Sequence, residues 1–177
     1  MRDRRSFLMK FVYGFSAVAT VGLSIPFIRS LFPSNLGEIY KDVDITGLRP
    51  GSSTTVSWLG RSVIIRARTQ EEVIALEQFN VGGLLDPESI ASIQPDFASG
   101  PSRSARPKYF LAFSNCTHLG CEVLPHVEGG FECPCHQSTF DGAGRVRRGG
   151  AAKRNLEVPD YRFIGLDTIR LLYRRKS

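Results

Sequence analysis

The sequence predicts a mainly β protein in which a single β-rich domain follows one N-terminal membrane-spanning helix. Residues 11–32 form an apolar stretch with one charge. Beyond it, short segments rich in β-branched and aromatic residues recur, most of them bounded by Gly, Asp or Pro. One later segment, beginning at Thr69, stands out as a helix. Residues 41–177 are numerous enough to enclose one hydrophobic core.

The amino terminus predicts export and anchoring. Arg4-Arg5-Ser6-Phe7-Leu8, followed by Lys10, resembles a twin-arginine export signal. Residues 11–32 match the roughly 20 residues that cross a bilayer, and Arg29 is their only charged residue. Because basic residues cluster before this stretch, residues 1–10 are expected in the cytoplasm and the bulk of the chain on the opposite side.

The apolar stretch is expected to be a retained anchor rather than a cleaved signal. Ala17-Val18-Ala19 could be read as a cleavage site. Cleavage there would leave only a short apolar core before the site, and residues 21–32 would remain as an apolar new terminus. Retention avoids both problems.

Residues 33–40 read as a flexible connection that leads into the domain of residues 41–177. Thr69 and Glu72 form a capping-box pattern that predicts a short helix with Val73 and Leu76 on one face. Residues 80–107, rich in Gly, Pro and Ser, are expected to form an ordered insertion with turns. The strand candidates are Asp42–Ile45, Thr54–Trp58, Arg61–Arg66, Tyr109–Ser114, Tyr161–Leu166 and Ile169–Tyr173, the last two as a hairpin.

Charge argues against a nucleic-acid partner. The chain has a formal net charge of +6, but residues 33–177 hold 18 basic and 16 acidic side chains. Much of the excess therefore lies at the amino terminus. The sequence contains neither a basic–aromatic patch nor a phosphate-binding loop.

All four cysteines and two of the three histidines lie in two short segments, Cys116–Cys121 and Cys133–Ser138. Each segment has one Cys and one His two or three positions apart, plus a further Cys. A zinc site, two ordinary disulfides or a redox-active Cys-x-Cys pair could use some of these residues. The Cys-x-His step is tight for zinc, which would also leave two cysteines unused. Disulfides alone leave both histidines unexplained, and the Cys-x-Cys pair ignores the first segment.

The two segments resemble the paired cluster-binding loops of Rieske iron–sulfur proteins. The resemblance implies one [2Fe–2S] cluster bound by Cys116 and Cys133 on the inner iron and by His118 and His136 on the outer iron. It also implies a disulfide between the two remaining cysteines of the loops, Cys121 and Cys135. Neutral imidazoles in place of two thiolates make the centre easier to reduce and can couple electron uptake to proton uptake.

The same resemblance gives roles to neighbouring residues. Ser138 stands where the family has a serine that donates a hydrogen bond to a bridging sulfide. Phe140 replaces a tyrosine found in many members, which predicts a lower reduction potential. Gln137 replaces the usual glycine. Residues 149–152, Gly-Gly-Ala-Ala, lack the proline usual in the loop that covers the cluster.

Over most of its length the chain resembles the iron–sulfur subunit of ubiquinol–cytochrome c reductase, the cytochrome bc complex. The segments that carry this wider resemblance are Trp58–Glu72, Leu85-Asp86-Pro87 and Asn155–Pro159. It implies an antiparallel β-barrel or sandwich with a cluster-binding subdomain at about residues 109–150. The partners would be cytochrome b, a c-type cytochrome and quinol in a dimeric complex of a bacterial inner membrane, with the cluster domain in the periplasm. His136 and His118 would be the reactive residues.

Two other Rieske classes are alternatives. The small subunit of a periplasmic arsenite oxidase also has a twin-arginine signal and a Rieske cluster, but the Trp58–Glu72 segment argues against it. A Rieske ferredoxin of a ring-hydroxylating oxygenase usually lacks the extra cysteine pair and needs no anchor. A zinc-stapled exported binding module is the non-redox alternative.

Overall fold

A computed structural model covers the whole chain and describes residues 2–31, 39–78, 81–126 and 129–173. The chain divides into two compact units, Met1–Ile39 and Tyr40–Ser177. Most of the expected connection at residues 33–40 lies outside the described residues. Its last residue, Tyr40, already belongs to the first strand.

The first unit contains helix α1, Arg2–Leu31, which is long and apolar enough to cross a membrane once. Pro26 lies inside this helix and cannot donate a backbone hydrogen bond there. Hydroxyl groups bind the turn before them: Thr20 Oγ1 donates to Ser16 O and Ser24 Oγ to Thr20 O. These bonds satisfy polar side chains without a partner outside the helix, as an apolar surrounding requires.

The second unit is mainly β and consists of three antiparallel sheets of three strands each. Their orders are β1–β9–β8, β2–β3–β4 and β5–β6–β7. The predicted mainly β fold is confirmed. Within the described residues each sheet is open, and the strands do not form one closed barrel. The strands are β1 (Tyr40–Asp44), β2 (Ser53–Trp58), β3 (Arg61–Ala67), β4 (Tyr109–Phe113), β5 (Leu124–Pro125), β6 (Phe131–Cys133), β7 (Ser138–Phe140), β8 (Tyr161–Phe163) and β9 (Thr168–Leu172).

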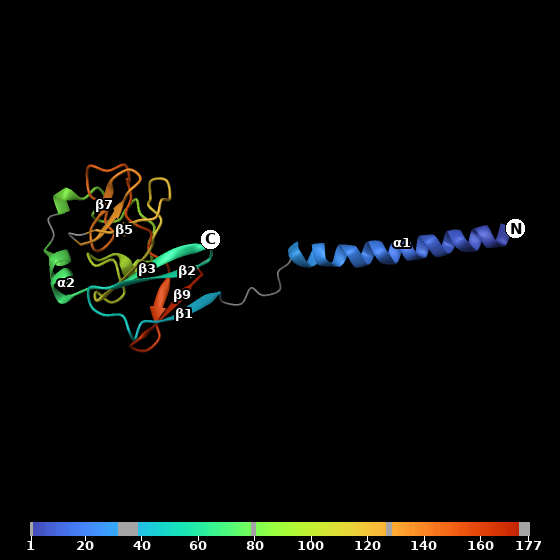
Figure 1. Ribbon diagram of the computed structural model, residues 1–177, viewed down its shortest axis with the longest axis horizontal. Helices are drawn as coiled ribbons and strands as arrows, with labels where there is room; N and C mark the ends of the chain where they lie inside the picture. The colour runs from blue at the N-terminus through green and yellow to red at the C-terminus, as the bar shows by residue number, and fades with distance from the viewer. Residues whose placement is uncertain (1, 32–38, 79–80, 127–128, 174–177) are drawn as a thin grey trace. The chain divides into compact units, whose positions relative to one another are not determined.

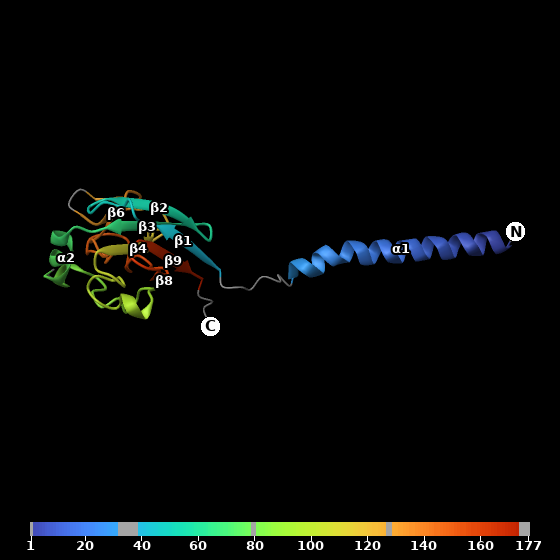
Figure 2. The same cartoon turned by 90° about the horizontal axis from the view of Figure 1, so that it is seen from below.

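The core is centred on β3 and β4, which pair in antiparallel register with Val63 opposite Phe113. Every residue of β4 is buried, because apolar side chains cover both faces of this strand. Figure 2 shows β3 between β2 and β4. In Figure 1 the strands β5 and β7 lie on the opposite side of this unit from β1 and β9.

Helix α2, Gln70–Glu77, begins as the sequence predicts. Thr69 Oγ1 accepts a hydrogen bond from Glu72 N at 3.3 Å, and Glu72 Oε2 accepts one from Thr69 N at 2.8 Å. The capping box is therefore confirmed. Leu76 is the buried residue of the helix, and Arg66 of β3 forms an ion pair with Glu72.

The insertion between α2 and β4 is ordered by polar contacts over its described part. Two short 3-10 helices, η1 (Val81–Gly83) and η2 (Asp96–Ala98), lie within it. Asn155 Nδ2 donates to Asp86 O and to Ser89 Oγ, both at 2.8 Å. The insertion is thereby fastened to the segment that follows the second cysteine-containing loop.

Candidate metal centre

The two cysteine- and histidine-containing segments are loops held by short strands. The first loop, Cys116–Cys121, lies between β4 and β5. It is closed by hydrogen bonds from Cys116 N to Cys121 O at 2.7 Å and from Gly120 N to Cys116 O at 2.9 Å. The second loop, Cys133–Ser138, joins β6 to β7, and these two residues are a register pair. Both loops are thus fixed at their bases by the backbone.

The structure separates the thiols from the imidazoles by depth. Cys116 is 3% exposed and Cys133 is 1% exposed, and both are free thiols. His118 and His136 are exposed, with ring centroids 4.7 Å apart and planes at 88°. Two sulfur donors therefore lie inside the protein while two nitrogen donors from different loops meet at its surface.

The two buried thiols are neighbours. Burial raises the pKa of Cys116 above its ordinary value, and the adjacent Cys133 thiol adds to the rise. The backbone N–H groups of His118 and Leu119 act in the opposite direction, because they favour the thiolate. A positive metal centre would remove the cost of deprotonation and would keep these N–H groups as hydrogen-bond donors to a sulfur.

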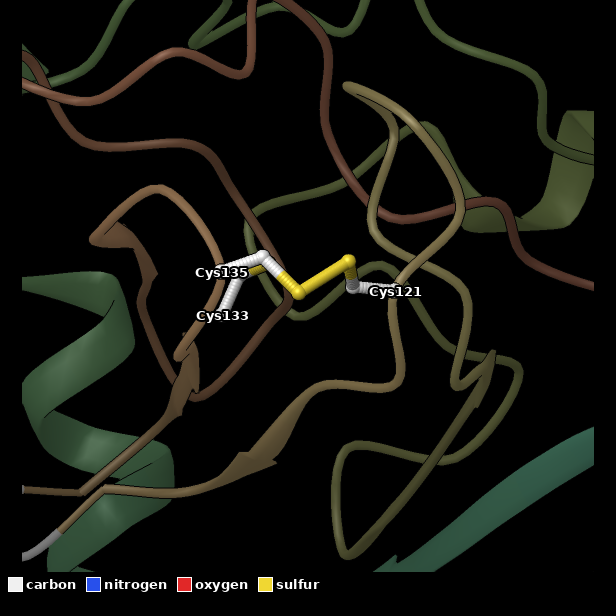
Figure 3. A group of neighbouring side chains, drawn as sticks. All are labelled: Cys121, Cys133 and Cys135. Carbon is white, nitrogen blue, oxygen red and sulfur yellow. A yellow bond between two sulfur atoms is a disulfide. The ribbon is translucent and has the colours of Figure 1, made fainter.

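A disulfide joins the loops. Cys121 and Cys135 are bonded with an S–S distance of 2.17 Å and a Cα–Cα distance of 6.6 Å. Figure 3 shows the bond passing from the first loop to the second, with Cys133 beside it. The three sulfurs of Cys121, Cys133 and Cys135 lie within 4.8 Å of one another. Sulfurs in a disulfide are not thiolates, so this trio is not a ligand set. Two thiols and two imidazoles remain as metal donors.

The segment 149–154 contacts both loops. Ala152 N donates to Ser138 Oγ at 2.9 Å, and Thr117 Oγ1 donates to Arg154 O at 2.6 Å. A Cβ at Gly150 would lie 2.6 Å from Ser138 Cα, so this backbone packs directly on the second loop. We expected no role for Thr117 from the sequence. Its position between the candidate ligands Cys116 and His118 was the signal that could have indicated one.

The backbone shows why glycine is usual at the position of Gln137. Gln137 has φ of +53°, in the left-handed region that favours glycine.

Phe140 is buried on the same face of β7 as Ser138, whereas Thr139 lies on the other face. His126, which matches neither loop, has Nε2 3.7 Å from Glu132 Oε2.

Comparison with known proteins shows the family to which the chain belongs. Residues 103–162 match the model of the Rieske [2Fe-2S] domain. The chain is 35% identical over 173 residues to the ubiquinol-cytochrome c reductase iron-sulfur subunit of Blastochloris viridis, covering 95% of this chain and 92% of that protein. The chain belongs to this family of Rieske iron–sulfur subunits. The subunit of the same name from Allochromatium vinosum is 36% identical and is covered over 82% of its length.

The fold comparison is consistent with membership of the family. A chain of a hyperthermophilic respiratory Complex III superposes with a TM-score of 0.53 at 22% identity, covering 89% of this chain and 96% of that chain. The cofactor is one Rieske-type [2Fe–2S] cluster. The donor chemistry fits this group, because a Rieske centre uses two thiolates on one iron and two imidazoles on the other.

Proposed function

We propose that this Rieske subunit accepts one electron from quinol at cytochrome b and passes it to a c-type cytochrome, with release of the quinol protons. The observation that carries the proposal is the depth difference between Cys116 and Cys133 on one side and His118 and His136 on the other. A cluster held this way supplies a one-electron acceptor whose outer edge can be reached by a partner. The 35% identity to a ubiquinol-cytochrome c reductase iron-sulfur subunit, in an alignment that covers 92% of that protein, favours this function over that of an arsenite oxidase subunit.

In this proposal Cys116 and Cys133 hold the inner iron. Their burial excludes water from the sulfurs and fixes their positions through the two loop bases. The N–H groups of His118 and Leu119 stabilise negative charge on Cys116. Ser138 contributes a further donor: its oxygen already accepts the Ala152 N–H, so the hydroxyl hydrogen remains to be donated to a cluster sulfur.

His118 and His136 would hold the outer iron. The second ring nitrogen of an exposed imidazole can bind or release a proton and can accept a hydrogen bond from quinol. A proton can therefore follow the electron at the same residue. We assign the quinol contact to His136, with His118 on the same exposed edge.

The amino-terminal sequence supports a proposal for where each segment of the chain lies relative to the membrane. Residues 1–10, with the twin-arginine signal, would lie in the cytoplasm, and residues 11–32 would anchor the chain in the inner membrane. Residues 33–40 would connect this anchor to the periplasmic Rieske domain, 41–177, with its cluster-binding subdomain at about 109–150. The basic residues that precede the apolar stretch support this orientation. The complex would be dimeric.

The test is made on the full-length chain purified from membranes with its partners. We expect non-haem iron and acid-labile sulfide in equal amounts, a Rieske-type EPR signal after reduction, and haem absorption from co-purified cytochromes. The three histidines supply matched variants: His118→Gln and His136→Gln should lose the Rieske signal, whereas His126→Gln should keep it. Purified protein without labile sulfide, or loss of the signal in the His126 variant alone, would overturn the proposal.

A further inference from the structure

Two arginines are among the most deeply buried side chains of the protein. Arg68, which follows β3, and Arg103, in the insertion before β4, are each 1% exposed. Burial lowers the pKa of both side chains to about 10, so both remain charged at neutral pH. Removing a charge from water is costly, and such a group is normally paired with an acid.

Main-chain carbonyl groups, rather than carboxylates, surround these two guanidinium groups. Arg68 donates to Ser102 O and Pro107 O at 2.8 Å and to Gly142 O at 2.9 Å. Within the part of the chain that the structure describes, no carboxylate oxygen lies within 4.0 Å of either guanidinium. The N–H groups of both arginines therefore have hydrogen-bond acceptors, but no carboxylate in contact neutralises their positive charges.

Arg103 is bound in the same way. It donates to Ala143 O at 3.0 Å, Gly144 O at 3.3 Å and Leu156 O at 2.8 Å, and its Nε donates to Gln94 Oε1 at 2.9 Å. Together the two arginines bind three consecutive carbonyl groups, those of residues 142–144. This turn directly follows β7 and so continues the second cluster loop.

The acids nearby do not balance these charges. Asp141 accepts from Arg145 Nε at 2.6 Å in a buried ion pair, and it attracts Arg68 and Arg103 only from beyond contact distance. Asp86 is buried and attracts Arg103 from beyond contact distance, while its oxygens accept hydrogen bonds from Ile90 N and Ser92 Oγ. Among the residues that the structure describes, three buried arginines face two buried aspartates, which leaves an excess of positive charge in the described interior.

The carbonyl groups that hold these charges lie a few residues after the second cluster loop. The chain from Ser138 to Ala143 can extend at most about 17 Å, and the turn of residues 141–144 shortens it. A Rieske centre with two thiolates and two imidazoles is formally neutral when oxidised and carries one negative charge when reduced. A buried positive charge stabilises the reduced form more than the oxidised form, and solvent screens it less than a surface charge.

We propose that the uncompensated buried charges of Arg68 and Arg103 raise the reduction potential of the cluster while their hydrogen bonds position the 141–144 turn. The inference rests on the proposed function, because it requires the cluster between the two loops. It concerns positioning and electrostatic residues that do not touch the cluster.

Gln94 allows the charge to be tested without disturbing the turn. In Gln94→Glu a carboxylate replaces an amide of the same shape and can accept the same Arg103 Nε–H. The adjacent guanidinium keeps this carboxylate ionised. Gln94→Met removes the hydrogen bond without adding charge. Gln78→Glu, at the exposed end of α2, makes the same chemical change where water screens it.

The measurement is a redox titration of the full-length protein followed by EPR. At a fixed ambient potential we expect Gln94→Glu to lower the reduced-to-oxidised ratio about fivefold. Gln94→Met and Gln78→Glu should leave the ratio within about twofold of the wild type. Equal shifts in Gln94→Glu and Gln94→Met, no shift in Gln94→Glu, or loss of the cluster from Gln94→Glu would each overturn the inference. A wild-type chain without a cluster would instead overturn the proposed function.

Discussion

The backbone N–H of Ala152 donates a hydrogen bond of 2.9 Å to the hydroxyl oxygen of Ser138, whose side chain is fully buried. The donor lies in the segment 149–154 and the acceptor in the second cluster loop. Since a hydroxyl has one hydrogen, accepting from Ala152 fixes the oxygen and leaves that hydrogen directed elsewhere. Substitution of Ser138 by alanine therefore removes the hydrogen bond from Ala152 and, in the proposed function, the donor to a cluster sulfur.

Ser138→Ala should lower the midpoint potential of the cluster. Loss of one hydrogen bond to the more negative, reduced form is worth about 1 to 2 kcal/mol, or about 40 to 90 mV for a one-electron couple. An EPR-monitored redox titration gives the value. Thr139→Val, one residue along and on the other face of β7, is the control and should not change the potential. Equal potentials for Ser138→Ala and wild type would contradict the assigned hydrogen bond.

Phe140→Tyr should raise the midpoint potential by a similar amount, about 40 mV for 1 kcal/mol. Phe140 shares a buried face of β7 with Ser138. In the paired strand Phe131 lies opposite Phe140, and Cys133 lies two residues further on, opposite Ser138. A hydroxyl added to this ring is expected to donate to a ligand sulfur. The same titration measures the shift. Phe97→Tyr, at a partly exposed ring remote in sequence from both loops, provides the comparison. An unchanged or lower potential in Phe140→Tyr would show that the hydroxyl finds no such acceptor.

Removing the disulfide should destabilise the folded domain. The bridge between Cys121 and Cys135 closes a loop of about 15 residues, for which the entropic stabilisation is about 3 kcal/mol. The double variant Cys121→Ser, Cys135→Ser should unfold at lower urea concentration and lose its EPR signal faster at a given temperature. Identical cluster lifetimes in the double variant and the wild type would show that the disulfide is not needed to hold the loops together.

Gln137→Gly should stabilise the protein. A side chain at φ of +53° costs about 1 kcal/mol, which glycine avoids. The larger entropy of glycine in the unfolded chain offsets part of the gain, so the net increase should be below about 1 kcal/mol. Urea unfolding measures this difference. Gln137→Ala keeps the strain and should give no increase, and a stability of the glycine variant at or below that of alanine would contradict the explanation.

The sequence predicted the longer strands because their signals are local. β2, β3 and β4 begin or end within one residue of their expected bounds, since alternating or continuous apolar runs between turn residues specify them. The C-terminal hairpin was also found, although β8 ends at Phe163 rather than Leu166. The predicted capping box is present because Thr69 and Glu72 need no distant partner.

The sequence did not reveal the strands of the loop region or the buried arginines. β5, β6 and β7 contain two or three residues each, too few for a periodic signal, and they pair only because the loops bring them together. No expectation about Arg68 or Arg103 followed from the sequence, since the carbonyl groups that surround them come from segments up to 74 positions away. Burial of a charge by distant backbone leaves no mark in the local sequence.

The two imidazoles sit edge to face on a single exposed patch, and this arrangement limits how the subunit can work in the proposed role. Any molecule that binds to one ring also covers the other, so the electron donor and the electron acceptor compete for the same binding surface. Loading and unloading of the electron must then alternate in time. Turnover would depend on how quickly one partner dissociates and the next one binds.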